Sequence, residues 1–232
     1  ECSVESISFR YGVDRARLLS MPFTPSPSLT SDVAKSKHEV LSLYRLDEGY
    51  FFYPAQFWAH KNHIRILEAL LLLNSNGERY TVVFSGGDQG NRAYLEHFVR
   101  RNDLDIQVRF LGFVPAENMR GLYEGCKAVI MPTYFGPTNI PPLEAWMLGK
   151  PLIYSVQFVE QAKNAAVLVN PDDASQLASA ITTCMDEKFC KQLVRAGQSR
   201  LQELNDEIKA SEADLLARLS RFEKRLHCWS EK

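Results

Sequence analysis

The sequence has no excess of charge of either sign. Lys and Arg number 27 against 28 Asp and Glu, which gives a formal net charge of −1 at pH 7. Proteins that bind nucleic acid usually carry a basic face, so this balance argues against a nucleic-acid partner. Cysteine is also scarce, because there are only five and no pair of them has metal-ligand spacing. Scattered cysteines in an odd number are typical of reduced thiols, and they argue against a disulfide scaffold or a cysteine-ligated metal.

Long hydrophobic runs are missing as well. The longest run, residues 69–73, is far short of the roughly 20 residues that a membrane-spanning helix needs. The first five residues, Glu-Cys-Ser-Val-Glu, have neither the basic start nor the apolar core of a signal peptide. We therefore expect a cytoplasmic protein. Because the chain does not begin with Met, we also expect it to be part of a longer one.

The sequence does contain a regular alternation of short apolar segments and amphipathic segments. Strands are expected at residues 18–21, 49–53, 80–84, 108–111, 128–131, 152–154 and 166–169, and helices at 63–73, 92–101, 117–125, 142–148 and 174–185. This alternation predicts an α/β fold with a parallel sheet covered by helices on both faces. We expect this domain to occupy residues 1–187, with its core at about 50–185. Residues 188–232 have helical apolar spacing among many charges, and they predict one or two long amphipathic helices that pack onto the domain.

Residues 132–151 are the most informative segment. They follow a predicted strand and carry a small residue at Gly136 and hydrogen-bonding side chains at Thr138 and Asn139. A short helix comes next, with Glu144 in its first turn. A loop that leaves a strand and opens a helix presents free backbone N–H groups and the positive end of the helix dipole. This arrangement suits a diphosphate, with a carboxylate nearby to hold sugar hydroxyls.

A second turn is expected at the same edge of the sheet. Gly86 and Gly87 follow the predicted strand at 80–84, just as residues 136–139 follow the strand at 128–131. Ligands of open parallel sheets bind outside the carboxyl ends of the strands. Both turns are therefore placed where a ligand is expected.

Several motifs stand in order along the chain. They are Tyr-Pro-Ala-Gln-Phe-Trp-Ala-His-Lys-Asn-His at 53–63, Val-Phe-Ser-Gly-Gly at 83–87, Phe-Leu-Gly-Phe-Val at 110–114, Ile-Pro-Pro-Leu-Glu-Ala at 140–145, and Asn-Ala-Ala-Val-Leu-Val-Asn-Pro-Asp-Asp at 164–173. Together they resemble the nucleotide-binding domain of the group 1 retaining glycosyltransferases of the GT-B fold. The resemblance covers roughly residues 50–185. It implies a Rossmann-like three-layer domain that forms one half of a GT-B fold, followed by long C-terminal helices.

The resemblance also implies an activity and a site. The expected reaction transfers a hexose from a UDP-, GDP- or ADP-sugar to a hydroxyl acceptor with retention, in bacterial polysaccharide or lipopolysaccharide assembly. Lys61 is implied to contact the diphosphate and Glu144 to hold the ribose, and no metal or other cofactor is required. The further residues implied to bind the donor are Gly86, Gly87, Val114, Gly136, Thr138, Asn139 and Ile140.

Some of these residues have simpler explanations, which remain open at this point. Gly86 and Gly87 fit a plain turn as well as close approach by a ligand, and Val114 fits core packing as well as contact with the base. His60 and His63 flank Lys61, but without Cys or a carboxylate nearby they are weak candidates for metal ligands.

The chain departs from the family pattern at two positions. The family's E-x7-E motif would place a first glutamate at Gly136, and an Arg is usual at Gln56, five residues before Lys61. These departures motivate an alternative, a non-catalytic domain that binds nucleotide sugars or a partner. A different GT-B enzyme, such as a sugar-nucleotide epimerase or a phosphorylase, is a third candidate.

The expected partners follow from the same resemblance. A GT-B enzyme needs an N-terminal acceptor domain, and a chain of this length does not hold both halves at the usual domain size. We therefore expect the 232 residues to be inactive alone, with any peripheral membrane contact made by the missing half. An apolar stripe at Leu215, Leu219, Phe222 and Leu226 leaves two alternatives, packing back onto that half or formation of a homodimer.

Overall fold

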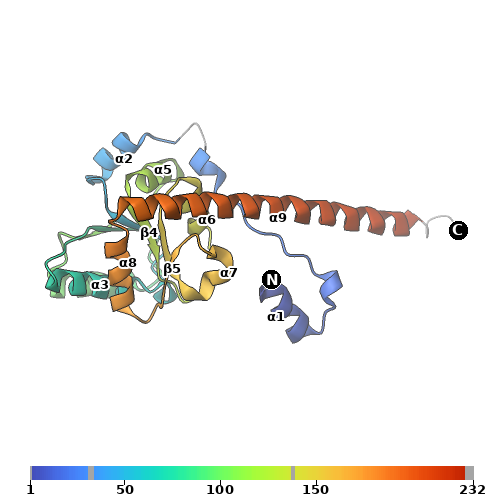
Figure 1. Ribbon diagram of the computed structural model, residues 1–232, viewed down its shortest axis with the longest axis horizontal. Helices are drawn as coiled ribbons and strands as arrows, with labels where there is room; N and C mark the ends of the chain where they lie inside the picture. The colour runs from blue at the N-terminus through green and yellow to red at the C-terminus, as the bar shows by residue number, and fades with distance from the viewer. Residues whose placement is uncertain (1, 31–33, 137–138, 228–232) are drawn as a thin grey trace. The chain divides into compact units, whose positions relative to one another are not determined.

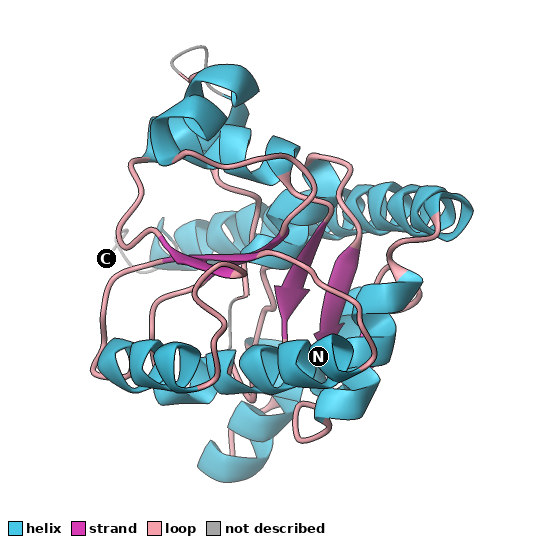
Figure 2. Ribbon diagram, turned by 90° about the vertical axis from the view of Figure 1, so that its left-hand side faces the viewer, coloured by secondary structure: helices cyan, strands magenta, loops and turns pink. Residues whose placement is uncertain are grey.

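The computed structural model describes residues 2–30, 34–136 and 139–227. Its six strands form a single sheet, which Figure 2 shows between helices on both sides. The strands are β1 (Phe51–Pro54), β2 (Val82–Ser85), β3 (Val108–Phe110), β4 (Ala128–Met131), β5 (Leu152–Ser155) and β6 (Val167–Val169). Their order is β3-β2-β1-β4-β5-β6, and every pair is parallel. The predicted α/β fold with a parallel sheet is confirmed.

The central strands are buried on both faces. Every residue of β2, β4 and β5 is buried, and so are the three aromatic residues that open β1. Continuous apolar runs of this kind are what a parallel sheet covered by helices requires, because neither face meets water. The edge strand β3 differs, since Arg109 at its middle is exposed.

Helices cover the sheet in two main pairs. Helix α3 (His63–Ser75) packs on α8 (Ala174–Thr183), and α2 (Lys37–Tyr44) packs on α5 (Ala116–Gly125). In Figure 1 the two pairs lie on opposite sides of the sheet. The remaining α-helices are α1 (Cys2–Tyr11), α4 (Arg92–Arg101), α6 (Pro141–Met147), α7 (Val159–Ala162) and α9 (Glu187–His227), and the 3-10 helices are η1 (Arg15–Arg17), η2 (Pro27–Thr30), η3 (Ala59–Lys61) and η4 (Val156–Phe158).

The described chain divides into two compact units that share helix α9. Residues 25–201 contain the whole sheet, and residues 1–24 together with 202–232 form the other unit. Within the smaller unit, Arg15 pairs with Glu5 at 3.0 Å and Arg218 Nη1 donates to the carbonyl of Ala16 at 2.8 Å. All the candidate site residues belong to the larger unit.

Several elements differ from the sequence prediction. The strand expected at 18–21 is wrong, since this segment is irregular and Met21 is 45% exposed. The segment has none of the β-branched or aromatic residues that favour strands, and no described strand pairs with it. Helix α2 was missed, although Ser36 and Glu39 form a reciprocal capping box at its start. Helices α1 and α7 were missed as well. The long helix from 187 onward, 41 residues as far as the structure describes it, agrees with the prediction of one or two long helices.

His63 opens helix α3 in an aromatic cage. Its ring lies 4.6 Å from that of Tyr53, 4.9 Å from that of Phe57 and 5.2 Å from that of Phe84, between ring centroids. The side chain is fully buried, and neither ring nitrogen has a hydrogen-bond partner among the described residues. The pKa of His63 is lowered to about 3, mainly by burial. The nearby charge of Lys61 also lowers the pKa, and the backbone of Ala55 acts in the opposite direction by raising it. His63 is therefore a neutral core residue at neutral pH.

This burial makes the stability of the fold depend on pH. His63 has a lower pKa in the folded than in the unfolded state, so only the unfolded chain takes up the proton between about pH 6.5 and 3. The contribution of neutral His63 to the free energy of unfolding is complete above about pH 6.5 and is lost as the pH falls toward 3. We expect wild type to lose about 2 kcal/mol more than His63→Phe between pH 7.5 and pH 5, measured by urea unfolding. Equal losses in the two proteins would contradict a buried neutral histidine.

Candidate functional site

The site lies where the strand order reverses. Strands β1 and β4 are neighbours in the sheet, although β2 and β3 come between them along the chain. Connections leave these two strands in opposite directions, so their carboxyl ends open a crevice in which ligands of this fold bind. Residues 55–62 leave β1 at this point, and residues 132–140 leave β4.

Lys61 is positioned by its backbone neighbours. The hydroxyl of Tyr53 in β1 donates to the Lys61 carbonyl at 2.8 Å. The next residue, Asn62, adopts the left-handed conformation, and its Nδ2 donates to the carbonyls of Pro132 and Pro171 at 3.0 and 2.8 Å. The chain at Lys61 is therefore tied to the segments that follow β1, β4 and β6.

The Lys61 side chain has no counter-ion among the described residues. Its Nζ lies 3.4 Å from Oδ1 of Asn139, and no carboxylate among the described residues pairs with it. The side chain is half-buried, and this burial lowers its pKa below the usual value. A partly desolvated cation without a compensating carboxylate is well suited to bind an anion.

Asn139 is held by a closed ring of hydrogen bonds. Its Nδ2 donates to the hydroxyl of Tyr154 in β5 at 2.7 Å, and that hydroxyl donates to Oε1 of Gln161 in α7 at 3.0 Å. Gln161 Nε2 donates back to the Asn139 carbonyl at 3.2 Å. Arg200 of α9 adds a further contact, since its Nε donates to the Gln161 carbonyl at 2.9 Å. The ring turns the amide oxygen of the buried Asn139 toward Lys61.

Gly136 and Asn139 form one feature. A Cβ atom at position 136 would overlap Oδ1 of Asn139, and would lie 2.9 Å from its Cγ. No side chain fits at position 136 while Asn139 keeps this orientation. A glutamate at position 136, where the family pattern has one, would therefore need the space that the Asn139 side-chain amide occupies.

Glu144 lies in the first turn of α6, as expected. Its side chain is buried, and the hydroxyl of Tyr123 donates to Oε2 at 2.5 Å. Burial raises the pKa of Glu144, while hydrogen bonds from Tyr123 and from the backbone of Ser26 lower it. A carboxylate can accept about four hydrogen bonds, so capacity for further donors remains.

The two glycines after β2 have different surroundings. A Cβ at Gly86 would collide with the backbone of Ala55, and its N–H donates to the Gly112 carbonyl at 2.7 Å. Close packing between backbones accounts for this glycine. Gly87 accepts a hydrogen bond from the Phe57 N–H at 3.0 Å, and nothing lies within 4 Å of where its Cβ would be. The turn is therefore open at Gly87.

The other predicted residues are placed as follows. Val114 is buried, as core packing predicts, and Ile140 is the half-buried residue before α6, where its carbonyl accepts from the Glu144 N–H at 3.2 Å. Thr138 lies outside the described residues. Sequence reasoning missed Ser26, Tyr123, Tyr154, Gln161 and Arg200. Nothing in the sequence pointed to the contact between Tyr123 and Glu144.

Among the described residues there is neither a metal-binding cluster nor a membrane-spanning helix. Nowhere in the described ranges do three or more His, Cys, Asp or Glu side chains come together as a metal ion would require. None of the described helices is both long enough and apolar enough to cross a membrane.

Comparison with known proteins decides the family. Residues 37–200 match the family described as "Glycosyl transferases group 1". The chain belongs to this family. O-antigen chain mannosyltransferase B of Escherichia coli is 26% identical over 161 residues, covering 68% of this chain and 42% of that protein. O-antigen chain mannosyltransferase RfbU of Salmonella typhimurium is 29% identical over 136 residues, covering 58% and 38%. The chain thus spans about two fifths of these curated relatives.

Solved glycosyltransferase structures have the same fold. Sucrose-phosphate synthase from Thermosynechococcus elongatus superimposes with a TM-score of 0.70 at 22% identity, covering 94% of this chain and 57% of that one. Anabaena HepE, solved in complex with UDP-glucose, gives a TM-score of 0.70 at 17% identity, covering 90% and 60%. The sheet of this group 1 chain is therefore that of a GT-B glycosyltransferase.

The Tyr123–Glu144 contact gives a testable consequence. Tyr123→Phe should leave the buried carboxylate short of a donor and destabilise the fold by about 1–3 kcal/mol at pH 7.5. Burial makes Glu144 easier to protonate in the folded than in the unfolded state, so the loss should shrink as the pH approaches 5. Urea unfolding at both pH values measures this. In a Glu144→Gln background, Tyr123→Phe should destabilise the fold by the same amount at both pH values. If Tyr123→Phe also destabilises the protein with Glu144 equally at pH 7.5 and pH 5, the interpretation is wrong.

Proposed function

We propose that this chain is the donor-binding part of a glycosyltransferase that moves a hexose from a nucleoside-diphosphate sugar to a hydroxyl acceptor with retention. The observation that carries the proposal is Lys61, a half-buried cation with no carboxylate partner among the described residues, at the reversal of strand order. Membership of the group 1 glycosyltransferases supports this assignment.

Mannose is the first candidate for the sugar, and an O-antigen type polysaccharide is the first candidate for the product. Two of the curated relatives are O-antigen chain mannosyltransferases, which favours this choice. Anabaena HepE was solved with UDP and with UDP-glucose, which favours a nucleotide-sugar donor of the general class. The base of the donor is left to experiment.

The proposed chemistry is electrostatic. The bond between the anomeric carbon and the diphosphate breaks, the acceptor oxygen bonds to that carbon on the same face, and the acceptor proton passes to the departing diphosphate. Lys61 and backbone N–H groups of the loop before α6 stabilise the negative charge that develops on the departing diphosphate. Glu144 accepts hydrogen bonds from the ribose. In this proposal no metal ion carries that charge.

The acceptor is proposed to bind to a second domain. The chain spans 57% and 60% of the two structures compared above, and about two fifths of the curated relatives. We expect the 232-residue chain to bind the donor without transferring the sugar. Mannosyl transfer by this chain alone, followed with a radiolabelled donor, would contradict this expectation.

A second candidate function is a domain that binds nucleotide sugars without catalysis. The observation that favours it is Gly136, because a neutral amide takes the space of the carboxylate that the family pattern places there. The two candidates separate when the chain is joined to its acceptor domain, since only the enzyme then turns over the donor.

Calorimetric titration tests the donor site directly. GDP-mannose, UDP-glucose, GDP, UDP and ADP are titrated into the 232-residue chain. Lys61→Ala should weaken the best ligand about 10- to 100-fold, as expected for loss of a charged hydrogen bond to phosphate. Asn139→Asp should weaken it comparably, because a carboxylate 3.4 Å from Nζ neutralises the cation.

The matched control is Lys209→Ala, which removes a lysine of α9 from the unit that does not contain the crevice. It should leave the affinity unchanged. If Lys61→Ala and Lys209→Ala bind the nucleotide equally well, Lys61 does not contact the diphosphate and the proposed site is wrong.

A further inference from the structure

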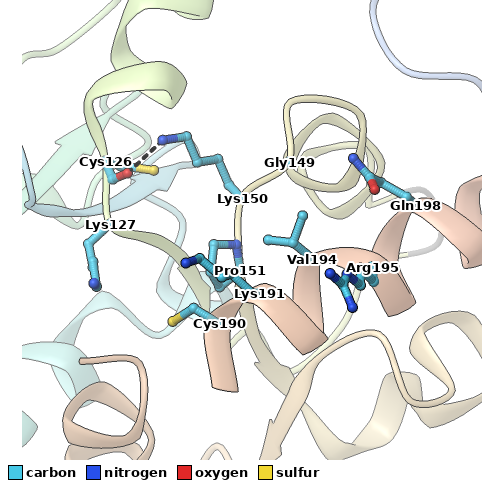
Figure 3. Close-up of a pocket in the computed structure, with 10 residues that line it drawn as sticks. All are labelled: Cys126, Lys127, Gly149, Lys150, Pro151, Cys190, Lys191, Val194, Arg195 and Gln198. Atoms are coloured by element: carbon cyan, nitrogen blue, oxygen red, sulfur yellow. Dashed lines mark hydrogen bonds between the residues drawn. The ribbon is translucent and has the colours of Figure 1, made fainter. Parts of the chain in front are cut away.

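A second cavity lies at the opposite edge of the sheet. It has a volume of about 500 Å³ and is formed by residues 126–127 just before β4, residues 149–151 just before β5, and the first turns of α9 (Figure 3). These segments precede the strands, whereas the donor crevice follows them. The two sites are therefore separated by the length of a four-residue strand, about 13 Å.

The cavity concentrates positive charge. Four of the residues that line it are cationic, namely Lys127, Lys150, Lys191 and Arg195, and none is acidic. The whole chain has a formal charge of −1, so this cluster stands out from the average. Gln198 adds a hydrogen-bonding amide, and Val194 and Pro151 add apolar wall.

Nearby carboxylates are mostly engaged elsewhere. Glu124 pairs with Arg120 at 2.8 Å, and Glu48 pairs with Lys37 at 2.7 Å. Asp186 accepts from the backbone N–H groups that open α9. Glu187, in the first turn of α9, is the nearby acid that has no such partner, and it does not line the cavity.

One of the four cations has a structural role. Lys150 Nζ donates to the carbonyls of Glu124 and Cys126 at 2.7 and 2.9 Å, which satisfies the last turn of α5. An ammonium group has three donors, so one N–H of Lys150 is left for a ligand. Figure 3 shows this side chain reaching toward Cys126 along the cavity wall.

The other three cations are not explained by the fold. The side chains of Lys127, Lys191 and Arg195 make no hydrogen bond or ion pair with any described residue. Lys191 and Arg195 are also four residues apart on α9, where like charges repel each other and weaken the helix by a few tenths of a kcal/mol. A bound anion would remove this repulsion.

We propose that this cavity binds a phosphate group through Lys127, Lys191 and Arg195, with the remaining N–H of Lys150 as a fourth donor. Several converging cations suit a multiply charged anion, and the guanidinium of Arg195 matches phosphate geometry. The volume exceeds that of one phosphate, so a phosphorylated molecule with an organic portion against Val194 fits. The phosphate can belong to a small molecule or to a lipid headgroup.

The first test is a titration followed by NMR. The 15N-labelled chain carries Lys61→Ala, so that the donor crevice does not contribute, and sodium phosphate is added at constant ionic strength. The Gly149 amide signal should shift in a saturable way. Lys191→Gln combined with Arg195→Gln should weaken this binding at least tenfold.

The matched control removes the same two charge types from the same helix outside the cavity, as Lys209→Gln with Arg221→Gln. This variant should bind phosphate like the parent. The absence of a saturable shift would overturn the proposal. Equal weakening in both double variants would also overturn it, because the loss would then follow from the change in net charge and not from the cavity.

The second test identifies the source of the phosphate. The same proteins are sedimented with vesicles of phosphatidylcholine, with or without phosphatidylglycerol. Binding to anionic vesicles that depends on Lys191 and Arg195 supports a lipid headgroup. Phosphate binding without vesicle binding supports a soluble ligand. If neither probe distinguishes the cavity variant from its control, the cavity is not a phosphate site. Failure of nucleotide binding at Lys61 has no effect on either result.

Discussion

The arrangement of the donor crevice depends on Asn62. This buried residue lies in the left-handed conformation between η3 and α3, and its amide donates to the carbonyls that follow β4 and β6. Asparagine tolerates this backbone conformation better than most residues. Without its amide, the Pro132 carbonyl would lose its donor, at a cost of about 1–3 kcal/mol if it stays buried and unsatisfied. The Pro171 carbonyl would keep the hydrogen bond from Arg65 Nε at 3.1 Å. One side chain thus joins three strand exits, and the residues on either side of it, Lys61 and His63, are placed by that junction.

This junction explains how one cation can dominate the crevice. The hydrogen bonds at Asn62 fix the backbone next to Lys61, and the ring of Asn139, Tyr154 and Gln161 fixes the group that faces its side chain. That group is a neutral amide. A carboxylate in its place would pair with Lys61 and reduce the attraction for a diphosphate. Gly136 and Asn139 are therefore best understood together, because the first must lack a side chain for the second to hold its position.

The sequence predicted the fold class because buried parallel strands are continuous apolar runs, which are visible without knowledge of contacts. The strand-exit rule also predicted that Asn139 follows a strand at the carboxyl edge, and the residues around Glu144 predicted its place in the first turn of a helix. The structure has both there. The binding roles of Lys61, Asn139 and Glu144 stay predictions. The sequence could not reveal Tyr154, Gln161 or Arg200, because their roles arise from contacts between β5, α7 and α9. Gly86 was ambiguous for the same reason, since only the approach of Ala55 shows that packing requires it. The capping box of α2 was a local signal that was overlooked.

The two edges of the sheet use charge in different ways. Helices that follow parallel strands begin at the carboxyl edge and end at the amino edge, so backbone dipoles favour anions at the first and cations at the second. At the carboxyl edge the dipoles favour the anion that we propose Lys61 binds. At the amino edge the dipoles account for cations that contact helix ends, which is what Lys150 does at the end of α5. They do not account for Lys191 and Arg195, which lie in the second and third turns of α9, beyond the first turn, in which the dipole acts. The repulsion between these two like charges is worth a few tenths of a kcal/mol, and the phosphate proposed for the cavity would offset it.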